Sequence, residues 1–249
     1  MTVEPAVLTK KYNILNVGQN IAASNSSWSF SGKVSDTFEE HVAKSVPLYK
    51  QGHELVLGLS DFFMHNQSIG YEIGCSTGIL SQAIARRNAH KNIAFVGLDI
   101  VPDMVQYAQD HYGDVEGVDF ECVDILDKEL EKCDLIVSYY TIQFIQPRVR
   151  QLVIDKIYNA LNWGGAFLFF EKVRAPDARF QDISTALYTD YKLDQGYSPE
   201  EIVAKSKSLK GVLEPFSTQG NLDLLTRAGF SDITTVMKYV CFEGFLAIK

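Results

Sequence analysis

The sequence of 249 residues contains no apolar run close to the roughly 20 residues that a membrane-spanning helix needs. Its first residues, MTVEPAVLTKKYN, lack the basic stretch, short apolar core and small-residue cleavage site of an export signal. Cysteine is scarce, and the four cysteines form no CxxC pair, which argues against a disulfide framework and against a zinc site. These absences predict a cytoplasmic protein with no membrane partner and no metal.

Basic residues are outnumbered. The chain has 23 Lys and Arg against 31 Asp and Glu, for a formal net charge of -8. Proteins that bind nucleic acid usually neutralise phosphates with a clustered basic face, so a nucleic-acid partner is disfavoured. With 46% hydrophobic and 12% aromatic residues, the chain has enough apolar surface to form a single large core.

The middle of the chain alternates short apolar segments with amphipathic ones. Strands are expected at 69–74, 92–100, 118–125, 133–144 and 164–173, with helices at 79–89, 102–112 and 149–161. This alternation implies right-handed crossovers and an α/β fold with a mostly parallel sheet. Several strands are apolar almost throughout, as expected when helices cover both faces of the sheet.

Further helical segments precede and interrupt this pattern. One helix is expected over 36–63, and two more within 174–217, the second with its N-cap at Ser198. We therefore divide the chain into a leader and helical cap, 1–66, and a core, 67–249, with a helical insertion at 174–217.

The C-terminal segment returns to the pattern of the core. Residues 221–230 form an amphipathic stretch that predicts a helix ended by Gly229. The following residues, 232–249, predict two strands with a break near Glu243-Gly244. Such a hairpin would add an antiparallel edge to the sheet.

The most informative stretch is YEIGCSTG at 71–78, directly after the first expected strand of the core. A strand that feeds a glycine turn and then a helix places free backbone N–H groups at the carboxyl edge of a parallel sheet, where ligands bind. The dinucleotide fingerprint G-x-G-x-x-G fails, because Ser76 and Ile79 stand where its second and third glycines belong. What remains is an acid, Glu72, followed by Gly74-x-Ser76-x-Gly78.

This pattern resembles the first motif of the class I S-adenosylmethionine-dependent methyltransferases. The resemblance implies a Rossmann-like fold with a mostly parallel seven-stranded sheet. It also implies S-adenosyl-L-methionine as the cofactor, with S-adenosyl-L-homocysteine as its product. By itself the turn leaves another interpretation open, since its glycines could serve only tight packing between helix and sheet.

Acids at the ends of the next two strands favour the S-adenosyl ligand. Asp99 lies 25 residues after Gly74, where a carboxylate can accept hydrogen bonds from both ribose hydroxyls. Asp124 could accept from the adenine amine while Ile125 offers a backbone donor, although an acid at a strand end is often only a helix N-cap. The expected cofactor-binding residues are Tyr49, Glu72, Gly74, Cys75, Ser76, Gly78, Asp99, Ile100, Met104, Asp124, Ile125 and Tyr139.

Several segments resemble one branch of that superfamily, the carboxy-S-adenosyl-L-methionine synthases. The resemblance runs from about Trp28 to the C-terminus and includes SVPLY at 45–49, GCSTG at 74–78, TIQF at 141–144 and GYS at 196–198. It implies a homodimer that makes carboxy-S-adenosylmethionine from S-adenosylmethionine and prephenate for wobble-uridine modification of tRNA. It further implies that Tyr49 reaches the ligand.

The chain departs from that family at a position that matters for function. The family carries a Lys-Arg pair after its Gly-Tyr-Ser helix start, and the arginine holds the extra carboxylate; the matching pair here is Lys205-Ser206. A serine cannot replace a bidentate guanidinium, and Lys207 projects about 100° away on a helix. A ligand-contacting asparagine of the family corresponds to Tyr139. These differences favour plain methyl transfer to a small-molecule acceptor, with carboxy-S-adenosylmethionine synthesis as the alternative.

Methyl transfer needs in-line approach and exclusion of water, and it needs a general base only when the acceptor must lose a proton. The candidate catalytic residues are His41, Tyr49, Tyr139 and Tyr197, with Tyr140 as a further possible base. His41 is equally consistent with a solvated or capping histidine. The histidines His53, His65, His90 and His111 lack metal-ligand spacing and are expected at the surface or in packing. A non-catalytic sensor of S-adenosylmethionine and a tRNA methyltransferase are two further hypotheses.

Overall fold

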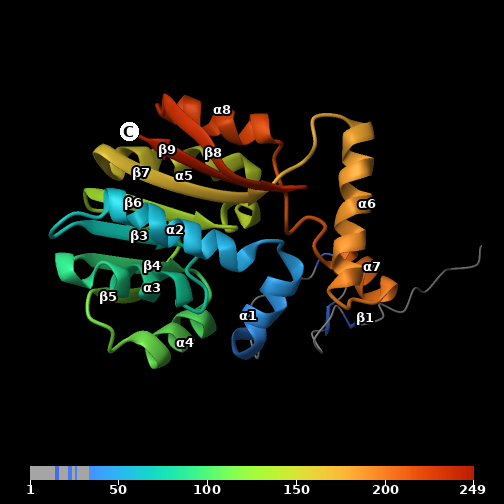
Figure 1. Ribbon diagram of the computed structural model, residues 1–249, viewed down its shortest axis with the longest axis horizontal. Coiled ribbons are helices and arrows are strands. Elements are labelled where there is room, and N and C mark those ends of the chain that lie inside the picture. Colours follow the sequence, from blue (N-terminus) through green and yellow to red (C-terminus); the bar gives the residue numbers. More distant parts are fainter. Residues whose placement is uncertain (1–14, 17–21, 24–25, 27–33) are drawn as a thin grey trace, which may run out of the picture.

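The computed structural model describes residues 15–16, 22–23, 26 and 34–249, and its centre is a seven-stranded sheet between two layers of helices (Figure 1). The strand order is β5-β4-β3-β6-β7-β9-β8, in which β3 to β7 are parallel and β9 runs antiparallel to β7 and β8. The strands are β3 (Ile69–Ile73), β4 (Ala94–Asp99), β5 (Val118–Cys122), β6 (Cys133–Tyr139), β7 (Leu161–Lys172), β8 (Asp232–Tyr239) and β9 (Phe242–Ile248). The predicted α/β class, the mostly parallel sheet and its antiparallel edge are confirmed.

Each face of the sheet has its own hydrophobic core, because neighbouring residues of a strand point to opposite faces. In β6, Leu135 and Val137 pack on the face covered by α2 (Tyr49–Phe63), α3 (Ile79–Arg87) and α4 (Pro102–Tyr112). Ile136 packs on the other face, which α5 (Pro147–Ala160) and α8 (Thr218–Ala228) cover. Among the described residues, no helix has both the length and the apolar character needed to cross a membrane.

The predicted helix over 36–63 is two helices. Helix α1 (Val34–Ser45) ends before Pro47, and α2 begins at Tyr49. Proline has no N–H to donate, and Leu48 adopts a left-handed φ of 57°, so the helix cannot continue through this point. The side chain of Asp36, the residue at which the predicted helix begins, lies outside the described residues. Upstream, β1 (Leu15–Asn16) and β2 (Ala22–Ala23) form a short antiparallel pair.

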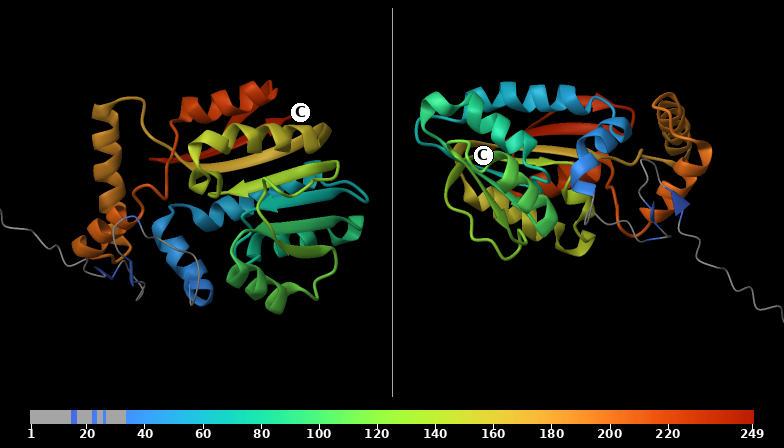
Figure 2. Two further views of the ribbon diagram at one scale, coloured as in Figure 1. Left: turned by 180° about the vertical axis from the view of Figure 1, so that it is seen from behind. Right: turned by 90° about the horizontal axis from the view of Figure 1, so that it is seen from below.

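The insertion stands beside the sheet and not on it (Figures 1 and 2). It consists of α6 (Ala178–Asp194) and α7 (Pro199–Ser208). The predicted N-cap at Ser198 is confirmed, and it is part of a capping box: the Ser198 side chain accepts from the Glu201 N–H, and the Glu201 carboxylate accepts from the Ser198 N–H. The chain leaves the sheet and returns to it at one place, where Arg174 and Ser217 form a parallel bridge.

The C-terminal hairpin turns earlier than predicted. Its break lies at Val240-Cys241, where Val240 has a φ of 50°, so the predicted break near Glu243-Gly244 is wrong. Gly244 lies inside β9 opposite Phe170, and a Cβ there would come within 2.4 Å of the Phe170 ring. This glycine therefore permits close strand packing and does not mark a turn. The predicted end of α8 at Gly229 is confirmed by its φ of 117°.

Candidate functional site

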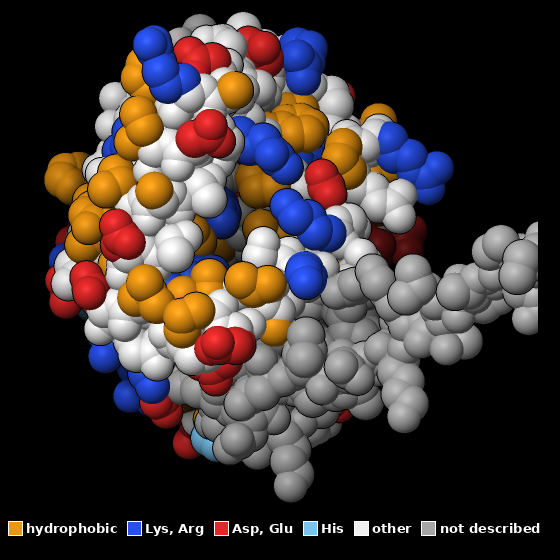
Figure 3. Space-filling view, turned by 90° about the vertical axis from the view of Figure 1, so that its right-hand side faces the viewer, with side chains coloured by type: hydrophobic (Ala, Val, Ile, Leu, Met, Phe, Trp, Pro, Cys, Tyr) orange, Lys and Arg blue, Asp and Glu red, His pale blue; other side chains and the backbone are white. Residues whose placement is uncertain are grey.

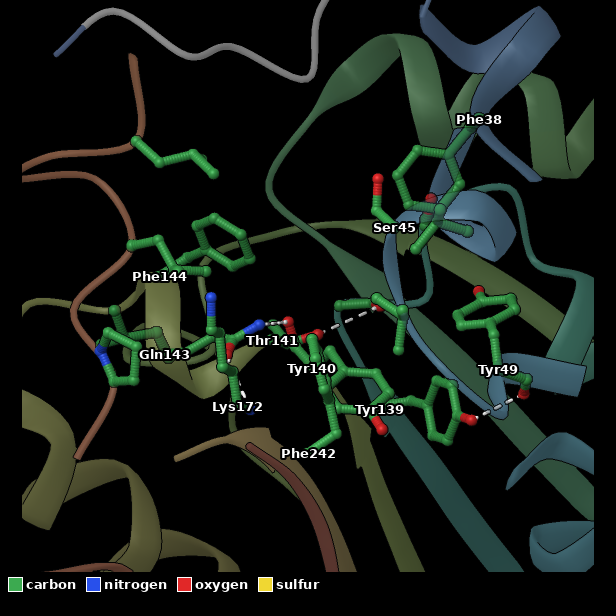
Figure 4. Close-up of a pocket in the computed structure, with 18 of the residues that line it drawn as sticks. Phe38, Ser45, Tyr49, Tyr139, Tyr140, Thr141, Gln143, Phe144, Lys172 and Phe242 are labelled. Carbon is green, nitrogen blue, oxygen red and sulfur yellow. Dashed lines mark hydrogen bonds between the residues drawn. The ribbon is translucent and has the colours of Figure 1, made fainter. Parts of the chain in front are cut away.

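A cavity of about 680 Å³ lies where the carboxyl ends of β3, β4, β6 and β7 meet α1, α2 and the insertion (Figure 4). Its volume is within the usual range for small-molecule sites, roughly 300 to 1,000 Å³. Acidic side chains line one part of it and basic side chains another. We call these parts the acid end (Glu39, Glu72, Asp99 and Asp124) and the basic end (Lys172, Arg174, Lys192, Lys205 and Lys210).

The predicted glycine turn is built by three residues in the left-handed region. Gly74, Ser76 and Gly78 have φ angles of 75°, 51° and 78°. Only glycine fits at Gly74, because a Cβ would lie 2.2 Å from Thr141 Oγ1. Ser76 holds the strained conformation with its N–H donating to Asp99 Oδ2 at 2.8 Å. The serine thus reproduces the backbone path that a glycine would take.

Glu72 is buried and Asp99 is half-buried, and the pKa of each carboxyl is raised above its ordinary value. The Asp99 carboxylate accepts backbone N–H groups of Ser76 and Val101, at 2.8 and 2.9 Å, and burial still raises its pKa. Glu72 accepts from Ser81 Oγ at 2.5 Å, while burial, and then repulsion from Asp99 and Glu39, raise the pKa of Glu72 to about 8. A cationic ligand would offset this crowding of acids.

All the predicted cofactor-binding residues except Gly78 line the cavity. Asp124 follows β5 in a loop, where its Oδ1 accepts from the Leu126 N–H at 2.9 Å. Gly78 does not line the cavity; a Cβ there would meet the Phe120 ring at 2.6 Å, so it serves helix–sheet packing. The other predicted residues all line the cavity, namely Tyr49, Glu72, Gly74, Cys75, Ser76, Asp99, Ile100, Met104, Asp124, Ile125 and Tyr139.

Two of the candidate catalytic tyrosines, Tyr49 and Tyr139, form an aromatic group with His53, which was expected at the surface or in packing. His53 lines the cavity and lies 4.6 and 4.7 Å, between ring centroids, from Tyr49 and Tyr139. The Tyr139 hydroxyl donates to the Tyr49 carbonyl at 2.7 Å (Figure 4). Burial raises the Tyr139 pKa and lowers that of His53 to about 4. The Tyr139 hydroxyl therefore anchors α2 in this structure.

His41 and Tyr197 join a network that ties α1 to α7. Lys205 Nζ lies 2.6 Å from His41 Nε2 and donates to Ser45 Oγ at 2.6 Å, and Ser45 Oγ is 2.9 Å from the Tyr197 hydroxyl. Burial, and then the charge of Lys205, lower the His41 pKa to about 3, so its imidazole is neutral. His41 lines the cavity and Tyr197 does not. Their contacts join two helices that are far apart in sequence.

The basic end was not predicted from sequence, apart from the Lys205-Ser206 pair. Ser206 lines the cavity, while the neighbouring Lys207 is exposed and does not line it. Lys172 at the end of β7 and Lys192 near the end of α6 place their Nζ atoms 4.3 and 4.5 Å from the ring centroid of Tyr188. Figure 3 looks at this side of the molecule and shows Lys and Arg side chains around a hollow.

Tyr140, which follows β6 in the cavity wall, has an unusual backbone conformation and a buried hydroxyl group. Its φ of 62° is in the left-handed region, which is rare for a bulky side chain. Its hydroxyl is buried and has no hydrogen-bond partner among the described residues. Burial raises its pKa, so the hydroxyl can donate to a ligand but does not act as a base near neutral pH.

Comparisons with known proteins agree on one family. Residues 71–167 match a family model described as a methyltransferase domain. The carboxy-S-adenosyl-L-methionine synthase of Staphylococcus epidermidis is 36% identical over 226 residues, which cover 89% of this chain and 97% of that protein.

Solved structures of low sequence identity share the fold. The apo form of the S-adenosylmethionine-dependent methyltransferase SibL matches with a TM-score of 0.58 at 17% identity, over 80% of this chain and 55% of SibL. Human N-acetylserotonin methyltransferase, solved in complex with SAM, matches with a TM-score of 0.53 at 19% identity, over 89% of this chain and 60% of that one. The chain thus spans little more than half of either structure.

Proposed function

We propose that this chain, which belongs to the carboxy-S-adenosyl-L-methionine synthase family within the class I S-adenosylmethionine-dependent methyltransferases, transfers a methyl group to a small-molecule acceptor. It is an S-adenosylmethionine-dependent enzyme of the methyltransferase fold, and its cofactor is S-adenosylmethionine. The proposal concerns two further points: the acceptor is a small molecule, and the reaction is methyl transfer and not carboxy-S-adenosylmethionine synthesis.

One observation carries the proposal: the glycine turn and the acids of three successive strand ends border one cavity. The residues fit the cofactor, because the turn lets backbone approach closely at Gly74 and the buried acids favour a cation. Asp99 would take the ribose hydroxyls, Asp124 and Ile125 the adenine, and Glu72 with the turn the amino-acid portion. When bound, the cofactor supplies a methyl group already activated by a sulfonium.

The protein's own contribution to methyl transfer would be positioning and the exclusion of water. Orientation of two reactants can supply about 7–11 kcal/mol of the barrier. The pKa of about 3 makes His41 a weak base, and the Tyr139 hydroxyl already donates to Tyr49. Among the candidates, Tyr49, Tyr139, Tyr197 and His41 thus serve in this proposal mainly to shape and close the site.

The alternative function has support of its own. A relative named carboxy-S-adenosyl-L-methionine synthase matches this chain over nearly its whole length, and the basic end could hold a carboxylate. Against it stands Ser206, which lines the cavity where the resemblance calls for an arginine. A serine offers one weakly polar hydroxyl where the guanidinium offers two parallel charged donors.

Mass spectrometry of the ligand that co-purifies with the protein separates the two functions. We expect S-adenosylmethionine or S-adenosylhomocysteine. A species heavier than S-adenosylmethionine by one CO₂ would overturn methyl transfer in favour of the synthase. As a second measurement, Ser206→Arg should create affinity for the carboxylated sulfonium that the wild type lacks, whereas a synthase would already bind it tightly.

The proposal extends to organisation and partners. It assigns the cofactor to the core, 67–249, and the acceptor to the side bounded by 1–66 and the insertion, 174–217. It includes a homodimer, supported by the exposed apolar side chains of Phe180 and Ile183 on α6, and testable by light scattering.

A cytoplasmic location is supported by four cysteines that are all free thiols. The net charge of -8 argues against a nucleic-acid acceptor, whose binding would weaken steeply with salt.

A further inference from the structure

Lys172 and Lys192 are cations that share one aromatic ring inside the cavity. Both Nζ atoms lie over the ring of Tyr188, at 4.3 and 4.5 Å from its centroid, although one lysine comes from β7 and the other from α6. Only 6% of Lys192 is exposed. Within the described part of the chain, the ion pairs involve neither lysine. Both ammonium groups therefore lie close to one aromatic ring, and no carboxylate of the described residues forms an ion pair with either of them.

Such an arrangement is costly unless something else balances it. Burial, followed by repulsion from Lys172, lowers the pKa of Lys192 to about 8, and burial also lowers that of Lys172. Lys205 adds a third amine close by, and its neighbour His41 is neutral and so brings no negative charge. Unbalanced charges in such surroundings are strongly unfavourable, whereas a bound anion would offset the charges of Lys172 and Lys192 together.

The surroundings of the two lysines suit a flat organic acid. Tyr188, Phe242 and Tyr140 bring aromatic surface to the same part of the cavity. The acid end repels anions, so a carboxylate would enter with its charge toward Lys172 and Lys192. The rest of such a molecule would then extend toward the acid end.

We propose that Lys172 and Lys192 form a subsite for the carboxylate of the methyl acceptor, which makes the acceptor a small organic acid. This inference rests on the proposed function, since it assumes a separate acceptor beside the cofactor. A second source of the same chemistry is a carboxylated sulfonium, whose own carboxylate would fill the subsite. The two sources differ in whether the anion binds together with the cofactor product.

Calorimetric titration tests the subsite with benzoate, and with benzamide as its uncharged analogue. The full-length protein is first saturated with S-adenosylhomocysteine, and each probe is then added. We expect benzoate to bind this complex at least about tenfold more tightly than benzamide, the difference expected for a charge-assisted contact. Lys172→Met and Lys192→Met should each weaken benzoate binding about tenfold. Lys207→Met removes an exposed lysine of α7 outside the cavity and should leave it unchanged.

Each other outcome has a definite meaning. Equal binding of benzoate and benzamide, or equal benzoate binding by all variants, would overturn the subsite. Benzoate binding to the ligand-free protein, titrated in parallel, that is absent from the S-adenosylhomocysteine complex would assign the carboxylate to the sulfonium ligand and overturn the acceptor. Failure of S-adenosylhomocysteine to bind would appear in the first step and would overturn the proposed function itself. Thermal unfolding of each variant verifies that it is folded. Because the two lysines are substituted separately, one folded variant is enough to test the subsite.

Discussion

The acid end and the basic end of the cavity are built in opposite ways. At the acid end, Asp99 and Glu72 accept hydrogen bonds from the backbone N–H of Ser76 and the hydroxyl of Ser81, so their positions are fixed by the fold. At the basic end, Lys172 and Lys192 project from a strand end and an inserted helix over one tyrosine ring. The comparison indicates a site prepared for a cation on one side and incomplete without an anion on the other.

The two ends also differ in what their neighbours do to protonation. Crowded carboxyls raise the pKa of Glu72 and crowded amines lower the pKa of Lys192, in both cases to about 8. Both shifts arise first from burial and then from like charges. Ligands of opposite charge would relieve both, and substitutions at each end separate the two effects.

The largest effect is expected at the acid end, from Asp99→Ala. The change removes a charged acceptor for two ribose hydroxyls and leaves the N–H groups of Ser76 and Val101 unpaired. Loss of about 3 kcal/mol, or roughly 100-fold in S-adenosylmethionine affinity, is expected from hydrogen bonds to a charged group. Calorimetry measures it, with the exposed Asp114→Ala as control. Unchanged affinity would break the assignment of this end to the cofactor.

At the basic end, Lys192→Met should stabilise the protein. The pKa of Lys192 is 10.5 in the unfolded chain and about 8 in the folded one. Below pH 8 the lysine is charged in both states, so the whole cost of burying its charge is subtracted from the free energy of unfolding. From pH 8 to 10.5 the unfolded chain binds more protons, so wild-type stability rises with pH. The variant should therefore be more stable near neutral pH by up to about 3 kcal/mol, with the difference shrinking toward pH 10.5.

Denaturant unfolding of both proteins across this pH range measures the difference directly. Comparing wild type with variant cancels the titrations of other groups, such as Cys133, whose pKa burial raises to about 12. Lys207→Met should show no such gain. A Lys192→Met protein that is less stable at every pH would mean that this lysine holds the fold together and that the contrast between the ends is wrong.

A smaller effect is the release of a proton when the cofactor binds. The pKa of Glu72 is raised from 4.5 to about 8, above neutral pH, so this carboxyl is largely protonated there. A cationic ligand favours the carboxylate, so binding should release up to about one proton. Calorimetry in buffers of different ionisation heat counts it. Glu72→Gln should abolish the release and weaken binding about tenfold, while exposed Glu129→Gln should do neither.

The smallest effect concerns Tyr140, which lies between the ends. Because its hydroxyl is buried without a partner among the described residues, Tyr140→Phe should raise stability by about 1 kcal/mol. Tyr188→Phe is the matched control with the opposite sign, since that hydroxyl donates to the Ser45 carbonyl at 2.7 Å. Thermal unfolding compares them. Equal losses in both variants would show that the Tyr140 hydroxyl is already satisfied.

Much of the acid end could be predicted from sequence, because its residues are local to one motif or follow successive strands. The turn at 71–78 and the acids Asp99 and Asp124 meet because carboxyl ends of parallel strands share one edge. Two local predictions, the single helix over 36–63 and the break near Glu243-Gly244, were wrong because a single residue determines the chain path at each place. Pro47 divides the first helix, and Gly244 permits packing against Phe170 where sequence suggested a turn.

The alternation of strands and helices, together with the acid after each strand, determined the fold and one half of the cavity without further information. The basic end was decided only by tertiary structure. Helix α6 exposes one apolar stripe, formed by Phe180, Ile183 and Leu187, and turns Tyr188 and Lys192 toward the cavity. Apolar periodicity alone would therefore have pointed to the wrong side of this helix. Only the packing of the insertion against α1 and β9 brings Lys192 beside Lys172, since no local pattern relates residues on separate elements that meet through long-range contacts.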